Sequence, residues 1–195
     1  IRVIEVHDGI TAHIAENSKY KNKSFDCMWL SSLTHSTSKG KPDIEYIDDT
    51  TVLNTINDIF DCTTKPLIFD GDSGGLIEHL KYTVSNLGRV GVSAIIFEDK
   101  VGNKKNSLVK TSHFQEQDSI ENFCKKIEIA KKKSHSSGMK IFARIESFIL
   151  NKGLKDSIIR AKEYIKAGAD GIMIHSKRNN PSEIFSFSRE YNKFS

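Results

Sequence analysis

The sequence predicts an α/β fold, a parallel β/α barrel of the TIM type that breaks off after about six βα units. Short apolar, β-branched runs alternate with longer stretches of helical period, a pattern typical of βα units around a parallel sheet. A closed eight-stranded barrel takes about 250 residues, and this chain has 195. Two interpretations follow: an open doubly wound sheet, or a barrel that lacks its last two βα units. The motifs described below favour the second.

The expected elements follow from the period of the apolar residues. Strands are expected at residues 2–6, 26–29, 66–70, 94–98, 140–145 and 171–175. Helices are expected at residues 52–62, 76–88, 118–134 and 154–167, and a last helix near Pro181. Gly168 can provide a left-handed cap at the end of the fourth helix. Two polar segments, residues 31–50 and 100–117, interrupt the alternation, and long loops of this kind usually build the site of such folds.

Composition bounds the function classes. The net charge is +4, but the lysines are scattered and no series of stacking aromatics is visible, so nucleic-acid binding is not expected. Cys27, Cys62 and Cys124 are far apart and form no CxxC pair, which argues against disulfides and zinc and favours a reducing, cytoplasmic location. No apolar run approaches the roughly 20 residues that span a bilayer. Because Ile1 is not a start residue, the chain is expected to begin inside a longer protein or to have lost its beginning.

Polar residues stand at the end of every expected strand. They are Glu5, His7 and Asp8; Trp29, Ser31 and Ser32; Asp70, Asp72 and Ser73; Glu98, Asp99 and Lys100; Arg144 and Glu146; and His175 and Ser176. In a parallel barrel these ends meet on one rim, so a functional site is expected there.

Asp70 and Asp72 give the first specific signal. Two carboxylates two residues apart lie on the same side of an extended chain. With Glu98 from the neighbouring strand they form a cluster that needs a cation, and oxygen-only ligands favour Mg²⁺ or Mn²⁺ over zinc. A turn that is merely rich in Asp and Gly is the alternative.

The polar segment after Glu98 gives the second signal. Lys104 and Lys105 can neutralise phosphoryl or carboxylate oxygens there, and Asn106 can donate to them, as in a lid that excludes water. An ordinary solvated loop would have a similar composition.

Three further residues are candidates for contact with an anionic ligand. Arg144 ends a strand and can hold an anion in bidentate fashion. His175 can donate to a reacting oxygen, although a lone histidine is more often structural. Asp43, in the long loop after the second strand, either faces the substrate or is a simple loop aspartate.

Five segments resemble the signature segments of the phosphoenolpyruvate mutase family, within the isocitrate lyase superfamily. They are WLSSLTHSTSKGKPD (residues 29–43), DGDSGG (70–75), EDKVGNKKNS (98–107), ARIES (143–147) and AGADGIMIHS (167–176). The third segment is the most specific, because the lyases of the superfamily carry Cys-Gly-His in that loop and phosphonopyruvate hydrolase has a differently composed one.

The resemblance implies a Mg²⁺-dependent interconversion of phosphoenolpyruvate and phosphonopyruvate, with P–C bond formation for phosphonate biosynthesis. The implied metal shell is Asp70, Asp72 and Glu98. The implied catalytic residues are Asp43, Lys104, Asn106, Arg144 and His175, and the implied substrate contacts are Trp29, Ser31, Ser32, Leu33 and Arg144. The substrate would be a small molecule, with neither nucleic acid nor membrane as partner.

The resemblance also sets expectations for the whole protein. Residues 1–195 would form a single barrel domain without its C-terminal βα units, and the full-length protein would be a homodimer or homotetramer. Asp8 and His35 depart from the family pattern, which more often has asparagine and aspartate there. The alternatives are phosphonopyruvate hydrolase, another lyase of C–C or P–C bonds, and a non-catalytic truncated barrel.

Overall fold

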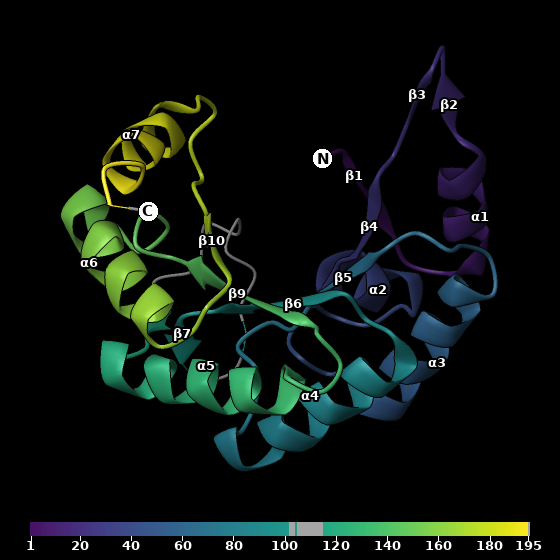
Figure 1. Ribbon diagram of the computed structural model, residues 1–195, viewed down its shortest axis with the longest axis horizontal. Coiled ribbons are helices and arrows are strands. Elements are labelled where there is room, and N and C mark those ends of the chain that lie inside the picture. The colour runs from purple at the N-terminus through teal and green to yellow at the C-terminus, as the bar shows by residue number, and fades with distance from the viewer. Residues whose placement is uncertain (102–103, 105–114, 195) are drawn as a thin grey trace.

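A curved sheet of six parallel strands forms the centre of the computed structural model, which describes residues 1–101, 104 and 115–194 (Figure 1). The strands are β1 (Val3–Val6), β4 (Cys27–Leu30), β5 (Leu67–Asp70), β6 (Ala94–Glu98), β9 (Lys140–Ile145) and β10 (Gly171–Ile174). Each pairs with the next one along the chain. A doubly wound sheet reverses its winding at a switch point, so this order excludes the doubly wound alternative. The winding is that of a barrel.

Helices cover the outer, convex side of the sheet in chain order (Figure 1). They are α1 (Gly9–Asn17), α3 (Asp49–Phe60), α4 (Ile77–Val90), α5 (Ile120–Ser134), α6 (Gly153–Lys166) and α7 (Ser182–Tyr191). Within the described ranges, β1 and β10 are the two edges of the sheet and do not pair with each other. None of the helices described is long and apolar enough to cross a bilayer.

The core lies between the sheet and the helices. Phe69, Phe97 and Ile141 point to the helix side and pack with buried residues such as Val84 and Ile127. Because side chains alternate along a strand, the neighbouring residues at the strand ends face the inside of the barrel. The apolar outer face therefore fixes which polar residues meet on the inner face.

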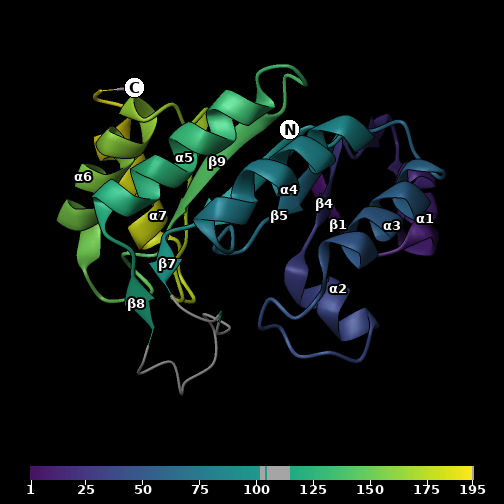
Figure 2. The same ribbon diagram turned by 90° about the horizontal axis from the view of Figure 1, so that it is seen from below.

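Two expected loops contain regular structure. Residues 31–50 hold α2 (Ser32–Ser38), and residues 100–117 are bounded by the pair β7 (Lys100–Val101) and β8 (Glu116–Gln117). Figure 2 shows α2, β7 and β8 projecting from the same end of the sheet. Helix α1 and the short pair β2 (Lys19–Tyr20) and β3 (Lys23–Ser24) were also absent from the sequence prediction. All of these elements are too short or too polar for a clear apolar period.

Helix ends agree closely with the sequence prediction. Gly168 directly follows Ala167, the C-cap residue of α6, and has a left-handed φ of +105°. The predicted left-handed cap is therefore confirmed. Helix α3 begins three residues earlier than residue 52, because the Asp48 carboxylate accepts a hydrogen bond from Thr51 N and starts the helix there. Pro181 is the N-cap of α7.

Candidate functional site

Arg144 stands at the centre of a buried group of charges on the inner face. Its guanidinium contacts Asp70 at 3.4 Å, and it also bonds to Glu98. The pairing of β6 with β9 sets Glu98 directly beside Arg144, and β5 contributes Asp70 from the next strand. Burial disfavours the charged form of Arg144, but Asp70, Glu98 and Glu146 outweigh it and raise its pKa. The guanidinium is therefore held by carboxylates from three strand ends.

Glu146 and Lys100 extend this group toward β10. Glu146 follows β9, is fully buried, and lies 3.2 Å from Arg144 Nε and 3.5 Å from Lys100 Nζ. His175 Nδ1 lies 2.8 Å from Glu146 Oε1. Burial raises the pKa of Glu146, but the hydrogen bond from His175 and the charges of Arg144 and Lys100 outweigh it, and the pKa falls to about 2. Glu146 is therefore an ionised acceptor.

Lys104 forms a second centre at the mouth of the barrel. Its Nζ donates to Asp43 Oδ1 and to Ser32 Oγ, each at 2.5 Å, and also pairs with Asp72. Ser32 in turn donates to Asp72 Oδ1 at 2.6 Å. Burial disfavours the charged form of Lys104, yet the carboxylates of Asp72 and Asp70 and the bond to Asp43 raise its pKa. Lys104 thus links three segments that are far apart in the chain.

Asp70 and Asp72 connect the two centres. Asp72 N donates to Asp70 Oδ1 at 3.2 Å, and Asp72 adopts a left-handed φ of +49°. Burial, with a further contribution from Asp70, raises the pKa of Asp72 to about 7, although Lys104 and Ser32 act in the opposite direction. A cation bound nearby would reduce this repulsion between the carboxylates of Asp70 and Asp72.

The predicted metal ligands do not form a ready-made cage. Among the residues that the structure describes, no three His, Cys, Asp or Glu side chains are arranged to hold a metal ion. Arg144 lies against Asp70 and Glu98, and Lys104 lies against Asp72.

The donor chemistry nevertheless fits a hard divalent cation. The three side chains offer only oxygen, which suits Mg²⁺. Buried Glu98 Oε1 accepts no hydrogen bond, although Lys100 Nζ lies 3.2 Å away. The rim carboxylates that pair with rim cations are Asp43, Asp70, Asp72, Glu98 and Glu146, and their partners are Lys100, Lys104 and Arg144.

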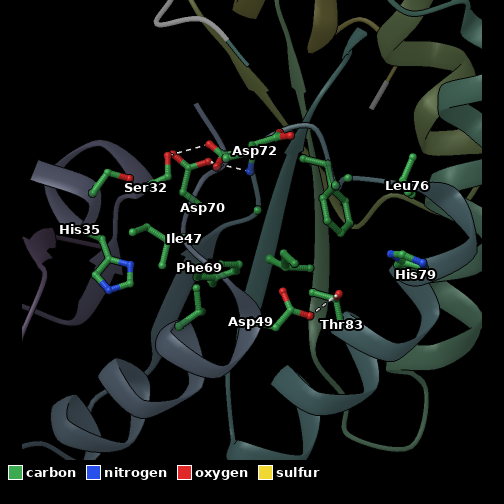
Figure 3. Close-up of a pocket in the computed structure, with 18 residues that line it drawn as sticks. Ser32, His35, Ile47, Asp49, Phe69, Asp70, Asp72, Leu76, His79 and Thr83 are labelled. Atoms are coloured by element: carbon green, nitrogen blue, oxygen red, sulfur yellow. Dashed lines mark hydrogen bonds between the residues drawn. The ribbon is translucent and has the colours of Figure 1, made fainter. Parts of the chain in front are cut away.

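A cavity of about 310 Å³ adjoins the charged rim, and Ser32, Asp70 and Asp72 of the rim belong to its lining (Figure 3). Phe69 and Ile47 form part of its lining between α2 and α4, and the Asp49–Thr83 hydrogen bond of 2.9 Å crosses one wall. No Lys or Arg of the described chain lines it. The cations that would hold a doubly anionic ligand, Arg144 and Lys104, therefore lie on the rim and not in the lining of this cavity.

Most predicted site residues are brought together, in two centres. Asp43, Ser32, Asp72 and Lys104 form one; Asp70, Glu98, Arg144 and, through Glu146, His175 form the other. Ser31 is the N-cap of α2 and Leu33 lies in its first turn with a 40% exposed side chain. Trp29 is paired in register with Ile68, two residues before Asp70. Asn106 lies outside the described residues.

The sequence places Lys100, Glu146 and Asp99 on the rim but assigns none of them a role, although all three are buried. Asp99 accepts from Tyr164 Oη and Gln117 Nε2, each at 2.8 Å, and from Glu146 N at 2.9 Å. Their signal was present, since Asp99 and Lys100 follow Glu98 directly and Glu146 stands two residues after Arg144. Spacing alone did not reveal which of these charges pair inside the barrel.

Comparison with known proteins agrees with this fold. The family model for phosphoenolpyruvate phosphomutase matches residues 1–194. Phosphoenolpyruvate phosphomutase of Tetrahymena pyriformis is 34% identical over 190 residues, which are 97% of this chain and 61% of that protein. The chain thus spans about three fifths of the length of this relative.

Two crystal structures are similar at equal sequence identity. That of phosphoenolpyruvate phosphomutase from Streptomyces platensis subsp. rosaceus has a TM-score of 0.90 at 30% identity, covering 98% of this chain and 64% of that one. That of phosphonopyruvate hydrolase in complex with oxalate and Mg²⁺ has a TM-score of 0.86, also at 30% identity, covering 98% and 63%.

The singly wound parallel sheet and the match to the family model define a β/α-barrel protein of the phosphoenolpyruvate mutase/isocitrate lyase superfamily. Within that superfamily, the chain belongs to the phosphoenolpyruvate phosphomutase family.

Proposed function

We propose that the protein is a phosphoenolpyruvate mutase that interconverts phosphoenolpyruvate and phosphonopyruvate by intramolecular phosphoryl transfer. The observation that carries the proposal is the position of Lys104, the lysine of the mutase-like segment. It is buried and contacts Asp43 and Asp72, which belong to two other family segments. A lysine brought over the rim in this way supplies positive charge where a phosphoryl group would lie.

The substrate site is proposed to lie between Arg144 and Lys104. Phosphoryl transfer passes through a loose, metaphosphate-like state, so the protein has to position groups and stabilise negative charge. Arg144 would hold the phosphoryl or carboxylate oxygens in a bidentate manner. Backbone N–H groups of the first turn of α2, near Ser31, Ser32 and Leu33, have no partners within the helix and could donate to the same anion.

His175, Asp43 and Asn106 complete the proposed site. His175 would donate to a phosphoryl oxygen, and Asp43 would hold Lys104 near the reacting group. Asn106 would donate from the lid segment, and Trp29 would line the inner wall of the barrel.

Mg²⁺ is the proposed cofactor, held by Asp70, Asp72 and Glu98. When bound, it would polarise the substrate oxygens and offset their charge. Holding it would replace contacts that these carboxylates make with Arg144 and Lys104, which would free both cations for the substrate. From its membership of the family, we also propose that the protein acts on a small-molecule substrate, and that the full-length protein is cytoplasmic and homo-oligomeric.

The barrel is proposed to be completed by two further βα units. Support comes from the unpaired edges of β1 and β10 in the described ranges, and from exposed apolar side chains on α1, Ile10 and Ile14, that face away from the core. Relatives of greater length would have room for these units.

Phosphonopyruvate hydrolase is the second candidate, because this chain is 30% identical in sequence to both the hydrolase and the mutase of known structure. ³¹P NMR of the purified protein with phosphonopyruvate and Mg²⁺ separates the two. The proposal expects the phosphonate signal to be replaced by that of phosphoenolpyruvate. Release of inorganic phosphate would establish the hydrolase instead.

A further inference from the structure

Glu146 is contacted by three nitrogen-bearing side chains in the barrel interior. His175 Nδ1 lies 2.8 Å from Oε1, Arg144 Nε lies 3.2 Å from the same oxygen, and Lys100 Nζ lies 3.5 Å from Oε2. The Glu146 side chain itself has 0% exposure. It lies two residues beyond Arg144, one of the residues proposed to touch the substrate, and directly contacts both Arg144 and His175.

The contact between Glu146 and His175 fixes the proton on one ring nitrogen. An ionised carboxylate can only accept hydrogen bonds. His175 Nδ1 must therefore carry the proton that lies between it and Oε1. Nε2 is left as the nitrogen that can face a ligand, and it makes no hydrogen bond within the described part of the chain. The His175 side chain is 25% exposed, so the ring is not sealed away from the barrel interior.

Glu146 is held in place without any help from a ligand. Its backbone N donates to Asp99 Oδ1 at 2.9 Å, and its backbone O accepts from Leu150 N at 2.9 Å. Asp99 is anchored in turn by Arg160 Nη1 at 3.2 Å and by Tyr164 Oη at 2.8 Å. This buried network ties the end of β9 to α6, on the outer side of the barrel.

We propose that Glu146 is a positioning residue, which holds His175 through its Nδ1–H group and so fixes Nε2 as the nitrogen that faces the substrate. When the ring takes a second proton, on Nε2, it donates that proton's hydrogen bond to a phosphoryl or carboxylate oxygen of the substrate. Through a second contact, the ion pair between its Oε1 and Arg144 Nε at 3.2 Å, it would also position the Arg144 guanidinium. The inference about Nε2 rests on the proposed function, whereas the Nδ1–H bond is a property of the protein alone. Such a carboxylate fixes both the tautomer and the angle of an imidazole.

The direct test is ¹H–¹⁵N correlation of the imidazole nitrogens in the wild-type protein, with His175 assigned by the signal that disappears in His175→Gln. Measurement above about pH 8 keeps ordinary histidines neutral. We expect His175 to carry its proton on Nδ1. A ring protonated on Nε2 alone would overturn the proposal. This readout needs no turnover, so it stands apart from any failure of the proposed function.

Two substitutions then test the role in catalysis. Glu146→Ala removes the acceptor, and we expect the Nδ1–H population of His175 to fall and kcat to drop about a hundredfold, with a smaller change in KM. Glu146→Gln keeps an acceptor oxygen and should restore part of both. Glu190→Gln, on the surface, is the matched control and should change neither. Wild-type kcat in a folded Glu146→Ala variant would overturn the proposal.

Discussion

Arg144 is the residue on which the charges of the site converge. A planar guanidinium can meet carboxylates from β5, β6 and the end of β9 at the same time, whereas an ammonium group is a single point charge. The raised pKa of Arg144 follows from these three partners and keeps the side chain cationic at any ordinary pH. The same geometry would let it hold a dianionic ligand once a metal ion has taken over the carboxylates.

The Arg144→Lys variant tests this geometry. Lysine keeps the charge but cannot reach Asp70, Glu98 and a ligand together, so we expect the affinity for oxalate in the presence of Mg²⁺ to fall about tenfold to a hundredfold. Titration calorimetry measures it. Arg89→Lys, on the exposed side of α4, is the control and should bind as wild type does. Unchanged affinity in Arg144→Lys would remove Arg144 from the anion site.

For single residues, the sequence could predict which charged side chains lie on the rim, but not which of them contact one another. Asp70, Glu98 and Arg144 each end an apolar strand, so their place on one rim could be read from the order of residues. The contact of Lys104 with Asp43 joins residues that are 61 positions apart, and its existence depends on how two loops fold over the rim. No local pattern encodes that distance.

Among the helices, α1 has an N-terminus determined by one side chain. Asp8 Oδ1 accepts from Thr11 N at 2.7 Å, and Thr11 Oγ1 accepts from Asp8 N at 3.1 Å, which together form a capping box. Asparagine offers the same acceptor oxygen, so the departure of this chain from the family pattern at residue 8 preserves the cap.

Two substitutions of Asp8 should separate the stabilisation by its capping hydrogen bond from the stabilisation by its negative charge. We expect Asp8→Ala to lower the free energy of unfolding by about 1 kcal/mol and Asp8→Asn to lower it much less. The backbone hydrogen bond from Thr11 lowers the pKa of Asp8 below its usual 3.8, despite some burial. The charge therefore stabilises the fold above that value, and its contribution is lost as the pH falls through the lowered pKa.

Urea denaturation at neutral pH and near about pH 3 checks both parts of this prediction. The difference in free energy of unfolding between the wild-type protein and Asp8→Asn should be smaller at the lower pH. An Asp8→Ala variant as stable as wild type at neutral pH would show that the cap contributes nothing.

Gly168 ends α6 in a conformation that L-residues rarely adopt. At φ +105° a side chain is strained, and an added Cβ would also lie 3.3 Å from Lys131 Cγ. We expect Gly168→Ala to lower the free energy of unfolding by about 1 kcal/mol or more. Gly138→Ala is the matched variant, because Gly138 has φ +72° with open space around it. Thermal denaturation measures both variants. If Gly138→Ala lowers the melting temperature more than Gly168→Ala does, the contact with Lys131 does not add to the destabilisation.

The long helices could be predicted at this scale and the short ones could not. Helix α5 shows apolar residues at spacings of three and four, whereas α2 has the sequence SLTHSTS and no such period. Its hydroxyl groups bond back to the helix backbone instead: Thr37 Oγ1 donates to Leu33 O and Ser38 Oγ to His35 O, each at 2.8 Å. Serine and threonine in a sequence indicate a loop as readily as a helix of this kind.

The order of the six strands is a property of the whole molecule. The sequence alone allowed a doubly wound sheet or a barrel, because both are built from the same βα units. Only the pairing of each strand with the next one along the chain distinguishes them. Singly wound pairing brings all six strand ends to one rim, which is where the charged residues meet.

Open edges should make stability uneven across the sheet. Strands β1 and β10 have a strand neighbour on one side in the described ranges, whereas β5 and β6 have one on both sides. We expect hydrogen exchange followed by mass spectrometry to show β1 and β10 exchanging at least about tenfold faster than β6. Equal protection would mean that the two edges are covered in solution.

The central claim is that the charged rim holds a divalent cation together with a small dianion. The most direct measurement is calorimetric titration of the protein with oxalate, with and without Mg²⁺. We expect binding only with Mg²⁺, its loss in Asp70→Asn, and its persistence in Thr83→Val, whose side chain lines the part of the adjoining cavity that lies away from Asp70 and Asp72 (Figure 3). Binding that needs no Mg²⁺, or that survives in Asp70→Asn, would contradict the claim.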